Sequence, residues 1–145
     1  MSFKVEVLGK PEPQGSKRAF LIRNTQRIVL VDQKGAELKA WRSRIAEAFA
    51  PLMDGNEPFR GPITLRIEFI FSRPRGHWGK RGLLPSAPTY KTTKPDIDKL
   101  VRGALDAMKG VVYVDDAQVV GIATTKGWAE NSPEKTIIEV SWNGY

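Results

Sequence analysis

Apolar and polar residues alternate strictly over two stretches of the chain. In residues 2–8 and 63–71 the apolar side chains fall at every second position. A period of two is that of a β-strand with one buried face. Residues 136–142 repeat this alternation near the end of the chain. The three stretches predict three strands, of which 63–71 is the clearest.

Two other stretches repeat their apolar residues at three- and four-residue steps, the period of an amphipathic helix. The first is 36–50, where Leu38, Trp41 and Ile45 mark the apolar face. The second follows Asp96, a good N-cap, and ends at Gly110. Its apolar positions are Ile97, Leu100, Val101, Ala104, Leu105 and Met108. These patterns predict two helices.

Shorter apolar runs predict the remaining strands. Runs at 20–22 and 28–31 flank a polar turn and indicate a hairpin. Runs at 111–114 and 119–124 flank Asp115-Asp116. The element order predicts one small α+β domain over residues 1–145, with a mixed β-sheet and two main helices.

Residues 72–94 carry no acidic residue and no clear period, so they predict a long loop. The chain as a whole has 23 Lys and Arg against 16 Asp and Glu, a net charge of +7 that favours polyanionic partners. His77, Trp78 and Tyr90 are interleaved with the cations of this loop, a mixture that suits phosphates and bases. The predicted DNA-binding residues here are Arg73, Arg75, Lys80, Arg81, Lys91 and Lys94. The alternative is a solvated surface loop.

Several classes of function are excluded. The chain has no cysteine and a single histidine, His77, which leaves no disulfide, no thiol nucleophile and no two-histidine metal motif. No apolar stretch approaches the roughly 20 residues of a membrane-spanning helix. The first residues lack the apolar core of a secretory signal. We therefore expect a cytoplasmic protein without a membrane partner.

Acidic residues cluster in one part of the chain. Five of the seven aspartates are Asp96, Asp98, Asp106, Asp115 and Asp116. Carboxylates that converge repel one another unless a cation joins them, and oxygen-only ligands favour Mg²⁺, with Mn²⁺ as the alternative. Such a metal beside a basic surface suits phosphodiester hydrolysis.

Each of these residues also has a plainer interpretation. Asp96 and Asp98 are expected at a helix N-terminus from capping and the macrodipole alone, and Asp115-Asp116 suits a turn. Arg102 lies one turn from both Asp98 and Asp106, so it either pairs with an aspartate or faces a phosphate. Trp41 is expected in the core and His77 in an ordinary loop. The residues alone leave these alternatives open.

The chain resembles the RusA-type Holliday junction resolvases of bacteria and their phages and prophages. The resemblance lies in the run Lys94-Pro95-Asp96-Ile97-Asp98-Lys99-Leu100-Val101-Arg102 and in Gly110-Val111-Val112-Tyr113-Val114-Asp115-Asp116-Ala117-Gln118-Val119. In that family an Asp-x-Asp pair begins a helix, a basic residue follows one turn later, and an Asp-Asp-x-Gln-Val segment supplies another carboxylate.

The resemblance implies a Mg²⁺-dependent endodeoxyribonuclease that acts as a homodimer in recombination and repair and nicks two strands of a four-way DNA junction. Carried over by position, the metal carboxylates are Asp96, Asp98 and Asp116, with Asp115 as a helper. Arg102 stands where the family often has Lys, and Lys99 where it often has Asn. Because Arg is a poor proton donor, Arg102 is interpreted as a phosphate clamp, and Lys99 as a substitute ammonium.

Further DNA contacts are expected from Lys17 and Arg18, which lie in a polar Gly- and Pro-containing segment. The competing class is a non-catalytic nucleic-acid binding module, in which the acids are only caps and turns. A nuclease for other branched DNA or for duplex DNA is a third alternative, and the sequence does not separate it from a junction resolvase. Cleavage-site preference, the dimer interface and the number of metal ions are likewise not determined by the sequence.

Overall fold

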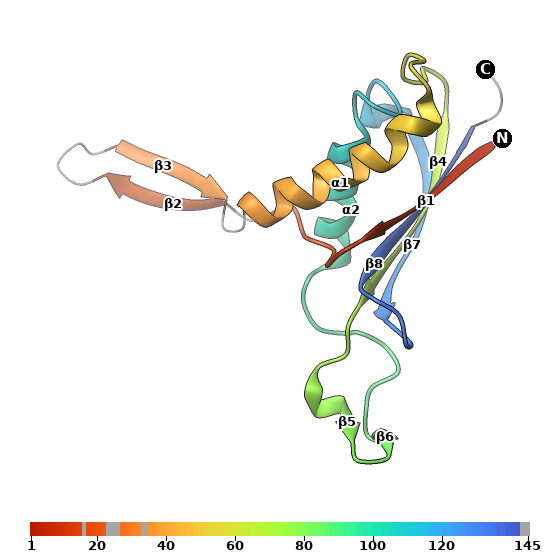
Figure 1. Ribbon diagram of the computed structural model, residues 1–145. Helices are drawn as coiled ribbons and strands as arrows, with labels where there is room; N and C mark the ends of the chain where they lie inside the picture. Colours follow the sequence, from red (N-terminus) through yellow and green to blue (C-terminus); the bar gives the residue numbers. More distant parts are fainter. Residues whose placement is uncertain (16, 23–26, 33–34, 143–145) are drawn as a thin grey trace.

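Four strands form the central sheet of the protein in a computed structural model, which describes residues 1–145 apart from 16, 23–26, 33–34 and 143–145 (Figure 1). The sheet order is β1, β8, β4, β7. The strand bounds are β1 Ser2–Leu8, β4 Ile63–Phe71, β7 Val119–Trp128 and β8 Lys135–Trp142. β8 is antiparallel to β1 and β4, whereas β7 is parallel to β4. The predicted α+β fold with a mixed sheet is confirmed.

The central strand β4 shows how the alternation builds this sheet. Its five odd-numbered side chains, from Ile63 to Phe71, are at most 4% exposed. The side chains between them, among them Arg66 and Glu68, are exposed or half-buried. One face of the sheet is therefore buried in the core, and the other carries the polar residues.

Two helices cover the buried face, α1 over Gly35–Met53 and α2 over Ile97–Met108 (Figure 1). They pack closely where Gly103 of α2 meets Trp41 of α1, since a Cβ at position 103 would lie 3.0 Å from the Trp41 ring. Trp41 is fully buried, and its Nε1 donates to Oγ1 of Thr136 on β8 (3.3 Å). Its predicted place in the core is confirmed.

The segment after α2 is a tight turn, so the strand predicted for 111–114 is wrong. Gly110 has φ +83°, and its N–H donates to the carbonyl of Tyr113 (2.7 Å). The N–H of Val112 donates back to the carbonyl of Met108 (2.8 Å). Val112 and Tyr113 are fully buried. A short apolar run has no distinctive period, and here it packs into the core as a turn instead of pairing along a strand.

The predicted hairpin is confirmed as β2 (Lys17–Ile22) and β3 (Arg27–Asp32), which are antiparallel. Figure 1 shows it projecting from the body beside the start of α1. The polar turn expected at 24–26 lies outside the described residues. In the described ranges, no helix is both long and apolar enough to cross a bilayer.

Residues 72–95 are more ordered than the loop predicted for them, and we call this segment the arm. It contains a 3₁₀ turn at Arg75–His77 and two short antiparallel strands, β5 (Trp78–Gly79) and β6 (Gly82–Leu83). The arm leaves the end of β4 and returns to the start of α2 (Figure 1). It therefore joins a core strand directly to the helix that carries Asp96 and Asp98.

Candidate functional site

The N-terminus of α2 presents a carboxylate that does not cap the helix. Asp96 occupies the N-cap position, as predicted, but its side chain makes no capping hydrogen bond. Its ion-pair contact is with Nζ of Lys99, at 3.9 Å. Because an N-cap Asp normally accepts from the first turn, the capping interpretation accounts for the position of Asp96 and not for its carboxylate.

Asp98, in the first turn of α2, and Arg102, one turn after it, are both exposed. In the described part of the chain, no ion pair within 4.0 Å joins Arg102 to Asp98 or to Asp106. The i,i+4 pairs considered from the sequence are therefore not formed. Arg102 is exposed and lies one helical turn from Asp98 and from Asp106 in the sequence, so its five donors are available to a ligand.

The segment after the turn holds Asp115 in a structural role. Oδ1 of Asp115 accepts from the N–H of Ala117 (3.0 Å), and Oε1 of Gln118 accepts from the N–H of Asp115 (2.8 Å). Together these bonds form a capping box for the 3₁₀ turn Asp116–Gln118. The turn interpretation of Asp115 is the one that the geometry favours.

Gln118 belongs to the Asp-Asp-x-Gln-Val segment, for which the resemblance names a role only for the carboxylate. Its Nε2 donates to the carbonyls of Phe59 (2.8 Å) and Gly61 (3.0 Å), and its Oε1 also accepts from Val114 N–H (2.9 Å). It ties the Asp115-Asp116 turn to the chain just before β4. The available signal was its spacing three residues after an Asp, which is that of a capping box.

Asp116 differs from its neighbour because one of its oxygens is buried without a partner. Oδ1 of Asp116 makes no hydrogen bond. The Tyr113 hydroxyl beside it donates to the carbonyl of Leu105 (2.9 Å). Burial, followed by the nearby negative charge of Asp116, raises the pKa of Tyr113 far above its usual value. The phenol therefore remains protonated, and Asp116 keeps an oxygen free for another ligand.

Within one copy of the chain, the carboxylates of Asp96 and Asp116 lie far apart. Asp116 lies beside Tyr113 at the C-terminal turn of α2, whereas Asp96 begins that helix. Nine residues from Asp96 to Leu105 correspond to about 14 Å along a helix axis. Among the described residues, no three acidic or histidine side chains are grouped closely enough to hold a metal. Asp96 and Asp98 share one end of α2, and Asp116 lies at the other.

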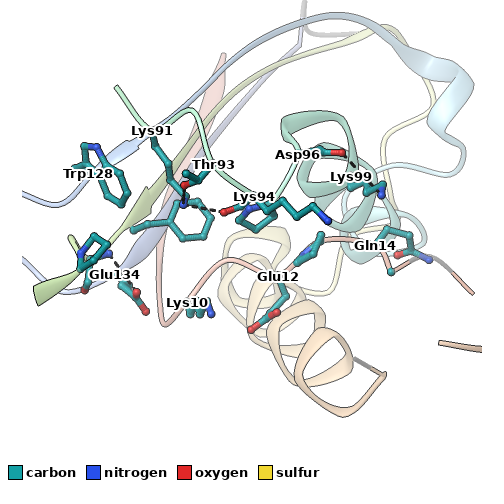
Figure 2. Close-up of a pocket in the computed structure, with 16 residues that line it drawn as sticks. Lys10, Glu12, Gln14, Lys91, Thr93, Lys94, Asp96, Lys99, Trp128 and Glu134 are labelled. Carbon is teal, nitrogen blue, oxygen red and sulfur yellow. Dashed lines mark hydrogen bonds and ion pairs between the residues drawn. The ribbon is translucent and has the colours of Figure 1, made fainter. Parts of the chain in front are cut away.

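A cleft of about 450 Å³ opens at the Asp96 end of α2 (Figure 2). Asp96 and Lys99 line one side of it, and Trp128 and Glu134 line the other. Further lining residues are Lys10, Glu12, Gln14, Lys91, Thr93 and Lys94. The lining has four lysines and three carboxylates, one of them that of Asp96, so the cleft has a net positive charge.

Two of the predicted DNA-binding cations hold the arm against the body. The Arg73 guanidinium lies 5.4 Å from the Trp128 ring centroid and donates to the carbonyl of Pro88 (2.8 Å). Nζ of Lys91 lies 4.8 Å from both the Trp128 and the Phe71 rings. Burial, and then the nearby charge of Lys126, lowers the pKa of Lys91. These contacts are structural anchors.

The histidine and the other arm cations are placed differently. His77 packs edge-on against Trp128, with ring centroids 5.1 Å apart, so it belongs to the same anchor. Trp78, on β5, is 46% exposed. The exposed cations of the arm are Arg75, Lys80, Arg81 and Lys94. Lys17 and Arg18 lie on β2, and their side chains fall outside the description.

Exposed carboxylates beside exposed cations on a basic α+β domain are the elements of a phosphodiester-cleaving nuclease. Comparison with known families agrees, because the family model described as Endodeoxyribonuclease RusA matches residues 10–141. The chain therefore belongs to the RusA family of endodeoxyribonucleases. It is also 29% identical over 147 residues to the uncharacterized protein YqaN of Bacillus subtilis (strain 168), covering 95% of this chain and 96% of that protein.

Proposed function

We propose that the protein is a Mg²⁺-dependent endodeoxyribonuclease that resolves four-way DNA junctions in recombination and repair by paired nicks, acting as a homodimer. The observation that carries the proposal is a set of carboxylates without a structural role in a RusA-family chain. Asp96 does not cap its helix, Asp98 is exposed and unpaired in the described chain, and Asp116 has a buried oxygen without a partner.

These three carboxylates would hold the metal. The unpartnered buried Oδ1 of Asp116 fits a cation ligand, and a donor set made only of carboxylate oxygens suits Mg²⁺ or Mn²⁺. When bound, the metal supplies activation of water and stabilisation of the leaving oxygen in phosphodiester hydrolysis. Asp115 already accepts a hydrogen bond from Ala117, so its contribution is to shape the turn that presents Asp116.

The cations next to these carboxylates would position the DNA strand. Arg102 is exposed beside Asp98, and a guanidinium binds a phosphate with two parallel hydrogen bonds. Lys99 pairs with Asp96 and lines the cleft together with Lys94. The exposed arm cations Arg75, Lys80 and Arg81 extend the basic surface away from the cleft. We assign Arg102 to the scissile phosphate and the arm to flanking phosphates.

A homodimer explains how separated carboxylates would form one site. Asp96 and Asp116 lie at opposite ends of α2, too far apart for one cation to bridge within a single copy. A two-fold axis exchanges the two ends, so that Asp116 of one copy joins Asp96 and Asp98 of the other. The dimer then has two identical sites, one for each of two symmetric nicks.

Cleavage of a synthetic four-way junction with and without Mg²⁺, beside a linear duplex of the same sequence, tests this function. We expect binding without metal and paired nicks in the junction only when Mg²⁺ is present. A non-catalytic binding module would bind the junction and release no product at any Mg²⁺ concentration. Equal cleavage of the duplex would favour the more general nuclease.

A further inference from the structure

A charged residue of β7 lies on the face of the sheet that the helices cover. Lys126 is the ionisable residue of this strand, and it pairs in register with Phe69 of β4. Paired residues on neighbouring strands point to the same side of a sheet, and Phe69 is fully buried in the core. Lys126 is half-buried. Because a partly buried ammonium is costly unless its donors are used, Lys126 needs partners on this face.

The partners of Lys126 are two backbone carbonyls just before α2. Its Nζ donates to the carbonyl of Thr93 (2.6 Å) and to that of Pro95 (2.8 Å). Within the described ranges, these are the hydrogen bonds of its ammonium group. Hydrogen bonds from a charged donor are stronger than those between neutral groups. The end of β7 is therefore tied firmly to the chain directly before Asp96.

A second ammonium group binds the carbonyl between these two. Nζ of Lys91 donates to the carbonyl of Lys94 (2.8 Å) and to Oγ1 of Thr93 (2.9 Å), as Figure 2 shows. The charge of Lys126 contributes to lowering the pKa of Lys91, so the two ammonium groups lie close enough to repel each other. The fold accepts this repulsion and places both cations on one segment. All three carbonyls of residues 93–95 are bonded as a result.

This segment determines how the chain enters α2 and where Asp96 points. The Asp96 side chain makes no capping bond, and its ion-pair contact with Lys99 is long, at 3.9 Å. The direction of its carboxylate therefore depends on where its backbone is held. The N–H of Leu100 donates to the carbonyl of Asp96 (3.2 Å), so the first turn of the helix depends on the same backbone. Fixing the three preceding carbonyls fixes both.

We propose that Lys126 is a positioning residue for the metal site: by binding the carbonyls of Thr93 and Pro95, it holds the Asp96 carboxylate in the direction in which it binds the cation. The proposal rests on the metal site of the proposed function. Lys126 acts through Asp96 and not on the DNA. Groups that orient a metal ligand typically contribute about 10–100-fold to metal affinity or activity.

The sign of the change in metal affinity separates this role from simple electrostatics. Removing a positive charge near a cation site by itself tightens metal binding, because a repulsion is lost. Losing the two carbonyl bonds weakens metal binding, because the Asp96 carboxylate then samples more directions. Lys126→Met keeps the apolar stem without the ammonium, and it should bind Mn²⁺ about tenfold or more weakly, with free Mn²⁺ measured by electron paramagnetic resonance. Lys126→Arg keeps the charge and the donors, and it should stay within about threefold of the parent.

Amide hydrogen exchange distinguishes local positioning from a general loss of stability. The Leu100 amide reports on the first turn of α2, and the Val112 amide, which donates to the carbonyl of Met108 (2.8 Å), reports on the other end. In metal-free Lys126→Met, Leu100 should exchange roughly tenfold faster, and Val112 at the parent rate. Lys4→Met is the matched control, since Lys4 is an exposed cation on β1. It should change neither the two amides nor the Mn²⁺ affinity.

The outcomes separate this role from the proposed function. Weaker Mn²⁺ binding by Lys126→Met, with faster exchange at Leu100 alone, supports the role even if no junction is cut. Mn²⁺ binding as tight as that of the parent, or equal acceleration of both amides, overturns it even if cleavage by the parent is normal. If circular dichroism shows that Lys126→Met does not fold, Lys126→Gln, which also loses the charge, is judged by the same two outcomes. A parent that binds no Mn²⁺ contradicts the proposed metal site itself, and with it this role.

Discussion

Adjacent aspartates in one turn have different surroundings. Asp115 accepts the hydrogen bond that caps the turn, whereas Asp116 has an oxygen that is buried and unpartnered. At the other end of α2, Asp96 occupies a cap position without making the cap bond. The fold therefore has a structural use for the first of these carboxylates and none for the other two.

Replacing the two aspartates without a structural role should stop cleavage and spare binding. Asp96→Asn and Asp116→Asn keep the shape of the side chain and remove an anionic ligand, so cleavage of a junction should fall by orders of magnitude. Binding measured by gel shift should persist or strengthen, because negative charge is lost near the DNA. Asp115→Asn is the matched control, since its amide oxygen still caps the turn. Near-normal cutting by Asp96→Asn would remove that residue from the site.

The role of Gln118 predicts an effect on stability. Gln118→Ala removes hydrogen bonds to the carbonyls of Phe59 and Gly61 and from the N–H groups of Val114 and Asp115. The Val114 N–H still donates to the Phe59 carbonyl (3.2 Å), so the loss falls mainly on Gly61 and Asp115. Such a loss should reduce the free energy of unfolding by about 1–3 kcal/mol in a denaturant titration. Gln118→Glu keeps the acceptor oxygen and loses the donor. Its free energy of unfolding should lie between that of the parent and that of Gln118→Ala. A loss below about 0.5 kcal/mol would mean that water replaces these bonds.

At the scale of elements, the long periodic segments were predictable from the sequence and the arm was not. β4 and α2 each have one buried face, so the spacing of their apolar residues predicts a strand and a helix. β5 and β6 are two residues each, which is too short for any period. The arm is held by Trp128, a residue about fifty positions beyond its 3₁₀ turn. Contacts of that kind leave no local signal.

The site was predictable in part for the same reason. The Asp-x-Asp pair at the start of a helix follows from local spacing. That Asp116 lies at the far end of the same helix depends on the turn at Gly110, whereas the apolar run 111–114 predicts a strand there. In the sequence, Arg73 and Lys91 are predicted DNA contacts in the same way as Arg75. Only the packing onto Trp128 distinguishes an anchoring cation from an exposed one.

The exposed arm cations should contribute to DNA affinity by counterion release. Arg75→Ala, Lys80→Ala and Arg81→Ala together should weaken junction binding and reduce the salt slope by roughly one unit for each lost phosphate contact. Stability should change little, because these side chains are exposed. The control removes Lys4 and Arg66, exposed cations on the polar face of the sheet. If junction binding by the triple variant and by the parent had the same salt dependence, the exposed arm cations would not contact DNA phosphates.

At the scale of the whole molecule, the proposed function depends on two copies acting together. The net charge of +7 favours DNA, and a dimer doubles that charge on one assembly. On the proposed assignment, the separation of Asp96 from Asp116 along α2 means that one copy does not bring all three carboxylates together among its described residues. The central claim is therefore that each nuclease site takes carboxylates from both copies.

Complementation between two inactive variants tests this claim most directly. Asp96→Asn and Asp116→Asn chains with different tags are co-expressed, and the heterodimer is isolated through both tags. One of its two sites then keeps every carboxylate, and the other lacks two. We predict that the heterodimer nicks a junction once in the presence of Mg²⁺, with about half the sites of the parent dimer, while each variant alone stays inactive. A heterodimer as inactive as the single variants, or the failure of the two chains to co-purify, would contradict the account.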